Sequence, residues 1–436
     1  MPIPVASEIP PPPPKSTLPI GEYAAFIGLD WGDQKHAIAL RPRGAGARVE
    51  NLILEHSAEK LHAWLEQLGE RFNHQPVAIA IESSKGAVVA ALVEYPWLAI
   101  YPIHPSTSRR FSTAFTPSGA KDDAPDARIL LDLIEHHRAR LRVLIPQEHE
   151  TRCVALLVEA RRKMVDRRTM LTNELTSLLK NYYPQALSLT GETLYSPLAL
   201  DFLERWPELA VLRKARAETL RAFYYEHQVR STKAVEKRVE LQQNCRPLSG
   251  DRALCEASML QLHALVAEVR TVNTHLSKAE NAIAETFKAH PDVEVFRSLP
   301  GAGRVMAPRL CVLFGLDRNR WRNAGELQKY YGIAPVTEKS GRQLHVHWRW
   351  SAPVFARQSL VEWAGQSVRA CGWAKAYYLQ QKQRQNGHSA ILRSLAFKWL
   401  RILWRCWRDR KPYDDALYLS HLRARNAPFL SLLETK

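Results

Sequence analysis

Four carboxylates in the first third of the chain combine residue type and position in a way that suits metal-assisted chemistry. Asp30 ends the apolar run FIGLD and Glu82 ends the run VAIAIE, so each leaves a predicted strand at its carboxyl end. Asp123 and Asp126 lie three residues apart at the start of a helical pattern, which places both side chains near one face. Each residue alone also fits a turn or a helix cap. Together, in a basic protein, they form the set that two Mg²⁺ ions would need.

Phosphodiester chemistry is the reaction that such a set predicts. Magnesium prefers hard oxygen ligands, and two ions about 3.5–4 Å apart can hold a scissile phosphate during an in-line displacement. Two nearby residues, Asp33 and His36, could orient the ligands by hydrogen bonding. A solvated hairpin turn explains both of them better.

A serine in the last third of the chain is a second candidate for chemistry. Ser340 precedes Gly341 in the segment YGIAPVTEKSGRQLHVHWRW, which predicts a polar loop, and the cations Lys339 and Arg342 flank the pair. A serine hydroxyl is a poor nucleophile unless a base or a metal ion activates it. The local sequence therefore leaves two possibilities open, a nucleophile beside a phosphate site or an inert surface serine.

The segment LPGAGRVMA predicts a tight turn that opens a helix. Its residues Gly301 and Gly303, followed by Arg304, could present backbone N–H groups to a phosphate, as a helix-hairpin-helix does. A plain turn between helices explains the same glycines. Pro308 falls inside the expected helix and should shorten or kink it.

Two basic stretches are predicted to contact a nucleic-acid backbone, because the chain as a whole carries a net charge of +17. A solvated helix face explains the first stretch too, and Trp399 in the second fits a core-facing stripe. The residues assigned to these contacts are Arg161, Arg162, Arg167 and Arg168 in the first stretch, and Lys398, Arg401 and Arg405 in the second.

Composition narrows the class of protein further. The charge suits a phosphate-rich partner but says nothing about catalysis. The six cysteines show no CxxC pair, which argues against zinc ribbons and disulfide frameworks. No apolar run approaches the roughly 20 residues of a membrane span, and the N-terminus lacks the order of a signal peptide. We therefore expect a soluble, cytoplasmic protein with no membrane partner.

The pattern along the 436 residues predicts an α/β domain followed by all-α regions. Short apolar runs around one amphipathic helix predict a mixed sheet covered by helices. Apolar residues at a/d spacing between Leu265 and Ile283 predict a coiled coil, which would be a helical hairpin or a dimer seam, or an ordinary core-facing helix. The expected parts are a disordered Pro-rich leader (1–20), the carboxylate domain (21–145), a helical coiled-coil linker (146–290), a mainly helical serine-bearing domain (291–425) and a tail (426–436).

In this order the segments GLDWGDQKH, IAIES, KDDAPDAR, LPGAG, RWRNAGELQKYYGIAP and KSG resemble the transposases of the insertion sequence 110 family, from about residue 23 to about residue 418. The resemblance implies an RNase H-like (RuvC-like) domain whose DEDD set, here Asp30, Glu82, Asp123 and Asp126, binds magnesium. It also implies that Ser340 attacks a DNA phosphate to form a phosphoserine link. Trp321 stands where the family often has Phe.

The partners follow from the same resemblance. They are donor and target DNA, a structured bridge RNA from the element itself, and further copies of the chain, as a dimer or, when assembled, a tetramer. A composite site would join the carboxylates of one protomer to the serine of another, in the bacterial cytosol or nucleoid. The alternatives are a DNA invertase of the same family, a nuclease or junction resolvase in which metal-bound water attacks, and a nucleic-acid scaffold with an inactive carboxylate site.

Overall fold

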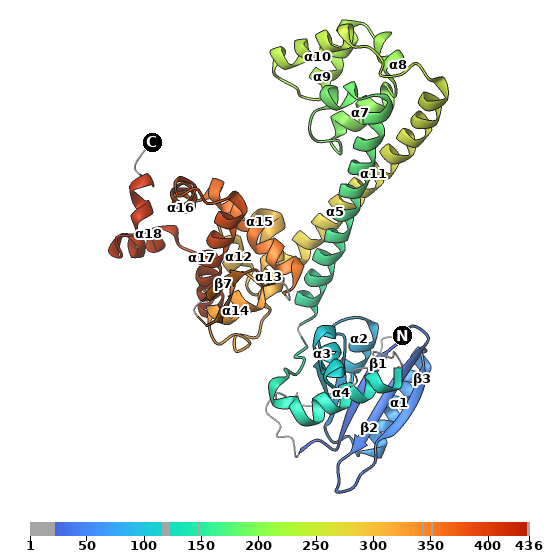
Figure 1. Cartoon of the computed structure of the whole chain (residues 1–436), viewed down its shortest axis with the longest axis vertical. Coiled ribbons are helices and arrows are strands. Elements are labelled where there is room, and N and C mark those ends of the chain that lie inside the picture. The colour runs from blue at the N-terminus through green and yellow to red at the C-terminus, as the bar shows by residue number, and fades with distance from the viewer. Residues whose placement is uncertain (1–21, 116–122, 147, 342, 350–351, 434–436) are drawn as a thin grey trace, which may run out of the picture. The chain divides into compact units, whose positions relative to one another are not determined.

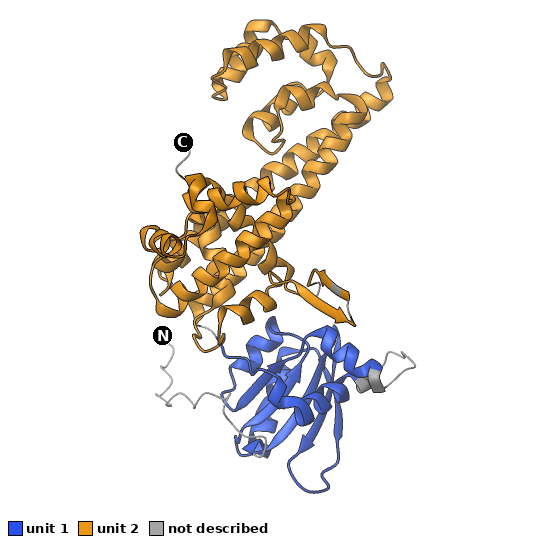
Figure 2. Cartoon of the chain, turned by 60° about the vertical axis from the view of Figure 1, so that its left-hand side comes forward, with its two compact units in different colours: residues 1–146 blue, residues 147–436 orange. Residues whose placement is uncertain are grey.

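The computed structural model describes residues 22–115, 123–146, 148–341, 343–349 and 352–433 (Figure 1). The predicted leader and Arg342 lie outside these residues. The chain divides into two compact units, residues 1–146 and residues 147–436 (Figure 2). None of the helices in the described ranges combines the length and the apolar character needed to cross a membrane.

The first unit is a mixed five-stranded sheet covered by helices, which confirms the predicted α/β architecture. The strand order is β3-β2-β1-β4-β5; β1 pairs antiparallel with β2 and parallel with β4. Its elements are β1 (Ala25–Trp31), β2 (Lys35–Pro42), β3 (Glu50–Glu55), α1 (Ala58–Arg71), β4 (Val77–Ile81), α2 (Ala87–Val93), β5 (Leu98–Pro102), α3 (Pro105–Phe115), α4 (Asp123–His137) and a 3₁₀ turn, η3 (Arg138–Arg140).

Apolar side chains on both faces explain why the central strands read as continuous apolar runs. Ile27 and Leu29 of β1 pack with the residues of α1 and α2. Phe26 packs on the other face with α4. Gly28 lies on that second face, and a Cβ atom there would be 1.9 Å from the carbonyl oxygen of Ala127 in α4. The backbone of α4 therefore crosses β1 at a distance that only glycine permits.

Two long helices, α5 (His149–Tyr182) and α11 (Arg252–Lys288), form the spine of the second unit. They run antiparallel, side by side (Figure 1), and an ion pair joins Arg161 near the start of α5 to Glu280 near the end of α11. Leu265, Val269 and Ile283 are buried in α11. Of the three arrangements that the a/d spacing allowed, the structure shows the helical hairpin within one chain.

A small helical lobe joins the far ends of α5 and α11, around its own apolar core. The remaining elements build a largely helical C-terminal part in which Trp363, Trp373, Trp399 and Trp407 are fully buried. The lobe contains α6 (Gln185–Thr190), α7 (Pro197–Arg205), α8 (Leu209–Arg213), α9 (Ala217–Glu226) and α10 (Thr232–Asn244). The C-terminal part contains α12 (Val293–Arg297), α13 (Gly303–Phe314), α14 (Ala324–Tyr330), β6 (Val336–Ser340), β7 (Gln343–His347), α15 (Val354–Ala370), α16 (Gly372–Gln383), α17 (His388–Asp409), α18 (Asp415–Ala424) and η4 (Pro428–Leu433).

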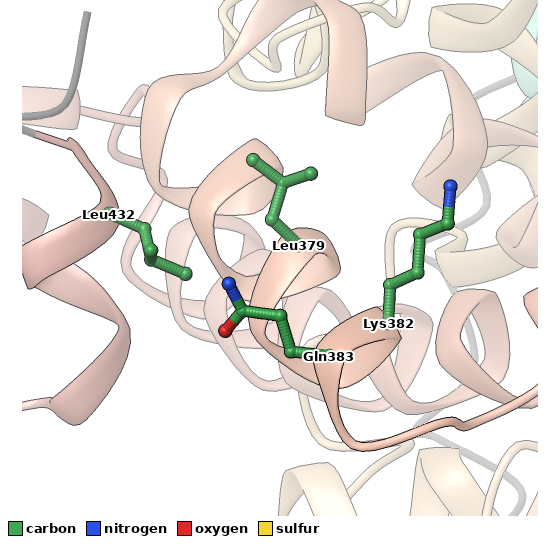
Figure 3. Close-up of a pocket in the computed structure, with 4 residues that line it drawn as sticks. All are labelled: Leu379, Lys382, Gln383 and Leu432. Carbon is green, nitrogen blue, oxygen red and sulfur yellow. The ribbon is translucent and has the colours of Figure 1, made fainter.

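The predicted tail is partly built into this fold, because Phe429 of η4 is buried against Tyr377 of α16. A surface pocket beside the same segment is lined by Leu379, Lys382, Gln383 and Leu432 (Figure 3). The lining contains no carboxylate and none of the predicted catalytic residues. We assign no chemistry to it.

A buried histidine ties the start of α5 to the segment that follows α11. The Nδ1 atom of His290 accepts from the backbone N–H of Asp292 at 3.1 Å, and its Nε2 atom lies 3.1 Å from Thr151 Oγ1. Burial lowers the pKa of His290, because the charged imidazolium would lose its hydration. The fold therefore favours the neutral ring.

We expect acid to destabilise the protein through His290. Since its pKa is lower in the folded state, its contribution is complete above the unfolded value of about 6.5 and is lost as pH falls below that value. His290→Gln, which cannot titrate, should lose less stability than the wild type between neutral pH and pH 5. Urea unfolding at several pH values measures this; parallel curves for the two proteins would contradict it.

Gly28→Ala should destabilise the first unit, because the new methyl group would meet the backbone of α4. Overpacking of this kind costs roughly 1–3 kcal/mol. Gly250→Ala is the control, since nothing lies within 4 Å of a Cβ atom there. Chemical denaturation followed by circular dichroism compares the two, and equal stability of both variants would refute the close approach.

Candidate active site

Asp30 and Glu82 emerge from neighbouring parallel strands in register. Leu29 of β1 is paired with Ile81 of β4, and the residue that follows each of them in the chain is the carboxylate. Side chains alternate along a strand, and Phe26 and Gly28 face α4, so Asp30 faces α4 too. The same alternation places Glu82 on that face. Both residues are partly buried, at the edge of the sheet where the two strands end.

The first turns of α4 lie over this edge. Ala127 is buried and touches Gly28, which is two residues before Asp30 and thus about 7 Å away along the strand. Asp126 precedes Ala127 and is exposed, which suits a ligand at the rim. Helix α4 begins at Asp123, whose side chain lies outside the described atoms. Asp30, Glu82 and Asp126 thus lie on the α4 side of the sheet, but they are not among the groups of described side chains whose ligand atoms lie within 4.8 Å of one another.

A serine that the sequence did not single out holds one of these carboxylates. The hydroxyl of Ser108, in α3, donates a hydrogen bond to Glu82 Oε1 and lies 3.1 Å from the carbonyl oxygen of Pro105. Ser108 is buried, so water does not compete freely for this contact. A serine in the first turn of a helix carries no special sequence signal, since the contact depends on how α3 packs beside β4.

His36 does not support the carboxylates, which corrects one prediction. It pairs with Trp31 across β1 and β2 and so points to the opposite face from Asp30. Its ring is buried, stacks on Trp31 with a centroid distance of 4.1 Å, and lies 3.2 Å from His56 Nδ1. Burial lowers its pKa, and His56 adds to this effect. The prediction of a solvated turn is wrong for His36, whereas Asp33 is exposed.

A second group of possible metal ligands in the described residues, Asp132, Glu135 and His136, lies further along α4. Glu135 already accepts from Arg41 at 2.5 Å, and the His136 ring lies 3.2 Å from the backbone oxygen of Asp132. These contacts are ordinary structural ones. The group is separate from the predicted DEDD set.

Ser340 ends strand β6 rather than lying in the predicted loop. It is paired with Gln343, the first residue of β7, so a two-residue turn joins the strands. Gly341 has φ +57° in that turn, in the left-handed region that glycine adopts readily. Ser340 and Lys339 are both exposed. In the second unit the hairpin of β6 and β7 extends away from the helices (Figure 2). Ser340 is the last residue of β6 before the turn.

Aromatic and cationic side chains fix the base of this hairpin. The guanidinium groups of Arg357 in α15 and Arg393 in α17 lie 4.8 Å and 4.5 Å from the ring centre of Trp348. Arg357 also donates to the carbonyl oxygen of Arg349 at 3.0 Å. Because these contacts lie just after β7, helices α15 and α17 hold the end of the hairpin that is far from its turn.

The glycine turn before α13 is built into the protein core. A Cβ atom on Gly301 would lie 2.9 Å from the backbone of Gln366 in α15, and Trp363 Nε1 donates to the Pro300 oxygen at 3.0 Å. Gly301 is thus needed for the packing of α15 against this turn. The sequence had predicted a role for it only at a phosphate. Gly303 faces open space, and Arg304 donates to Asn281. The prediction that Pro308 would shorten the helix is wrong, because α13 runs unbroken to Phe314.

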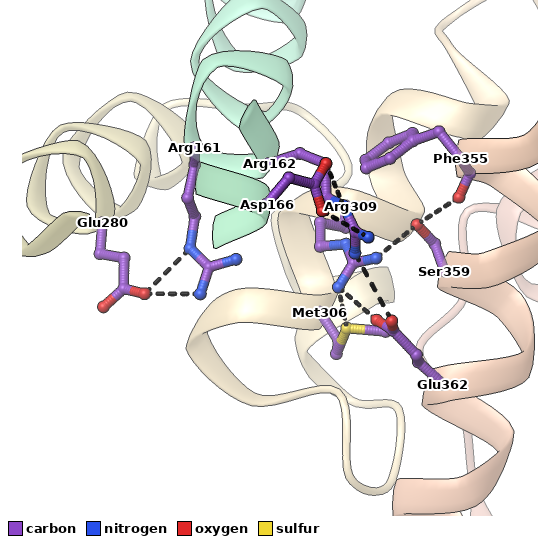
Figure 4. Close-up of polar contacts among 9 residues, drawn as sticks. All are labelled: Arg161, Arg162, Asp166, Glu280, Met306, Arg309, Phe355, Ser359 and Glu362. Atoms are coloured by element: carbon purple, nitrogen blue, oxygen red, sulfur yellow. Dashed lines mark hydrogen bonds and ion pairs between the residues drawn. The ribbon is translucent and has the colours of Figure 1, made fainter. Parts of the chain in front are cut away.

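The first basic stretch makes contacts within the protein. Arg161 donates to Glu280 at 2.6 Å, and Arg162 pairs with Asp166 at 2.9 Å (Figure 4). Arg167 pairs with Glu268 at 2.8 Å, and Arg168 lies over the ring of Tyr195. The side chain of Arg161 is only 15% exposed, so its predicted contact with nucleic acid is not supported.

Arg309, which the sequence did not single out, joins α13 to α15 from a buried position. It donates to Glu362 at 2.7 Å and to Ser359 at 2.9 Å, and the Phe355 ring lies beside it (Figure 4). Burial lowers its pKa, against the effect of Glu362. The sequence around Arg309 does not predict that it joins two helices.

In the second basic stretch, the Lys398 ammonium lies over the ring of Tyr377, and burial lowers the pKa of this lysine. Arg401 and Arg405 are exposed on α17, although Arg405 pairs with Asp409 in the next turn. Arg401 and Arg405 are therefore the members of this stretch that solvent can reach most readily.

Comparison with known proteins places both parts of the chain in one family. A family described as a DEDD transposase of the IS110 type matches residues 27–184, and the Transposase IS116/IS110/IS902 family matches residues 293–379. A mini-circle putative transposase for IS117 from Streptomyces coelicolor is 26% identical over 398 residues, covering 89% of this chain and 95% of the relative.

Two further relatives agree. An uncharacterized 43.6 kDa protein of insertion element IS110 from Streptomyces coelicolor is 26% identical, over 91% of this chain and 97% of that protein. The putative transposase y4uE from Sinorhizobium fredii is 26% identical over 47% of this chain and 57% of its own length. With its two matched regions and its aligned strand-end carboxylates, the chain belongs to the insertion sequence 110 family of transposases, enzymes that act on DNA.

Proposed function

We propose that this transposase cuts and rejoins DNA through a covalent link between Ser340 and a DNA phosphate. The observation that carries the proposal is the register of β1 and β4, which aligns Asp30 with Glu82 beneath the start of α4. That arrangement is what a phosphodiester site of the RNase H type requires. Ser340 adds an exposed hydroxyl at the tip of a hairpin, where a DNA backbone can reach it.

Asp30, Glu82, Asp123 and Asp126 would hold magnesium in this proposal. Their oxygen atoms fit the ion, because magnesium prefers carboxylate ligands, and the edge of the sheet leaves Asp126 open to solvent. When bound, the ion would neutralise charge on the phosphate and orient it. Ser108 keeps the Glu82 carboxylate in one orientation, so that its second oxygen can face the site.

The serine route retains the energy of the phosphodiester bond. Attack by Ser340 Oγ on phosphorus forms a phosphoserine and releases a DNA hydroxyl, and a second DNA hydroxyl reverses the exchange on rejoining. No nucleotide triphosphate is consumed. The carboxylates and the serine lie in different units of the chain, and we propose that protomers in a dimer or tetramer combine them, one supplying the carboxylates and another the serine.

Nucleic acid would be bound through its backbone, with donor and target DNA recognised by pairing to a bridge RNA from the element. The net charge of +17 supports this class of partner. The residues proposed for these contacts are Gly303, Arg304, Lys339, Gly341, Arg342, Arg401 and Arg405. Arg167 and Arg168 could join them only by exchanging their present protein partners.

A strand-transfer assay with the ends of the element and its flanking RNA tests the proposal. We expect a magnesium-dependent protein–DNA adduct that Ser340→Ala abolishes, while DNA binding by this variant stays within about twofold of wild type, because an exposed serine adds little to affinity. Retained cleavage without an adduct would instead establish attack by metal-bound water. Inversion without excision would identify a DNA invertase, and activity unchanged by chelation would exclude the carboxylate site.

Ser108→Ala should weaken metal use without unfolding the protein. Groups that orient a metal ligand typically contribute 10-fold to 100-fold in metal affinity or activity, so the magnesium concentration for half-maximal adduct formation should rise by about tenfold or more. Ser106→Ala is the control on the same helix, since Ser106 contacts His104 instead. A magnesium titration of both variants decides this, and identical curves would remove Ser108 from the site.

A further inference from the structure

One face of the serine hairpin carries a group of polar side chains besides Ser340. On β6, Ser340 and Glu338 are two residues apart, and their partners on β7 are Gln343 and His345. All four side chains therefore point to the same side. His347 follows on β7, on this side too. Lys339 points to the opposite side. All four residues of the two pairs are exposed, so a DNA strand against this face would meet them together.

The twist of the hairpin brings diagonal neighbours on this face into contact. Glu338 is paired with His345, yet its Oε1 atom lies 2.8 Å from Nε2 of His347, the next residue on the same face of β7. Ser340, two residues after Glu338 on β6, has His345 as its diagonal neighbour in the same way that Glu338 has His347. Diagonal side chains on a hairpin lie about 7–8 Å apart at their origin, within reach of a long ring. Rotation of the His345 side chain can therefore bring its ring to Ser340 Oγ.

Gln343 provides the contact that would orient the ring. His345 Nε2 lies 3.4 Å from Gln343 Oε1. With its proton on Nε2 facing that oxygen, the ring presents an unprotonated Nδ1, which can accept a proton. We propose that His345 is the general base that removes the proton from Ser340 Oγ. This inference rests on the proposed role of Ser340 as the nucleophile.

The other charged groups of the hairpin are less suited to the task. Glu338 and His347 are paired with each other, and this hydrogen bond raises the pKa of His347 and so favours its charged form. Lys339 is on the opposite face and is a cation. Among the described residues of the hairpin, His345 is thus the basic group that the strand pairing brings nearest to Ser340 on its own face.

The step balances without a further reactant. As Ser340 Oγ bonds to phosphorus, its proton passes to His345 Nδ1 and the bond from phosphorus to the leaving DNA oxygen breaks. The leaving DNA oxygen takes up a proton from solvent and becomes a DNA hydroxyl, and the imidazolium gives its proton back to solvent. Rejoining runs the same transfers in reverse. A histidine in this position typically accelerates such a step by 10²-fold to 10⁴-fold.

The experiment measures the rate of adduct formation on a nicked DNA duplex carrying the ends of the element, with the flanking RNA and magnesium present. His345→Gln should form the Ser340 adduct at least about 100-fold more slowly than wild type, with unchanged DNA binding. His347→Gln is the matched control on the same strand and should stay within a few-fold. Added imidazole should restore part of the rate in His345→Gln only.

The outcomes separate the two proposals. A Ser340 adduct formed by His345→Gln at the wild-type rate would overturn the assignment of the base and leave the serine mechanism intact. A rate lost equally in His345→Gln and His347→Gln, with no rescue by imidazole, would show that the ring is structural and would overturn it as well. If wild type forms no adduct, or Ser340→Ala still forms one, the proposed nucleophile itself is wrong.

Discussion

The contact between Gly28 of β1 and Ala127 of α4 determines the geometry of the carboxylate side of this transposase. Because no side chain separates the two backbones, the start of α4 is held against the sheet two residues from Asp30. A larger residue at position 28 would meet the backbone of Ala127, lift the helix and carry Asp126 away from the strand ends. The need for glycine at position 28 thus depends on a helix that lies about a hundred residues further along the chain.

The carboxylates and the serine depend on different kinds of support. Asp30 and Glu82 are positioned by a buried parallel strand pair, which is rigid because apolar side chains cover both of its faces. Ser340 is carried by an exposed two-stranded hairpin, and such hairpins have little stability of their own. The stacking of Trp348 with Arg357 and Arg393 at its base compensates for this in part. The carboxylate half of the proposed chemistry is therefore carried on a packed sheet, and the serine half on a hairpin that can adjust to the DNA.

The sequence predicted well what apolar patterning governs. The strand that carries Asp30, the strand that Glu82 follows, the helical middle region and the core position of Trp399 all follow from local periodicity. What patterning could not predict are contacts made by packing: the hydrogen bond from Ser108 to Glu82, the burial of His36 beneath Trp31, and the ion pairs that engage Arg161 and Arg162. Net charge identified the class of partner, but it cannot tell an arginine that faces solvent from one that joins two helices.

The start of α5 packs into the C-terminal core, which affects the order in which the parts of the chain can fold during synthesis. The C-terminal core contains Val154 and Val158 from the start of α5 together with Leu360, Trp363 and later residues, so it draws on segments some 200 residues apart. On the ribosome, the apolar face of α5 emerges long before the helices that cover it. The first unit has its own apolar cores, whereas the core of the serine-bearing part needs segments from both ends of residues 147–436, so a chain cut short before α15 would carry the carboxylates without the helices that support the serine hairpin.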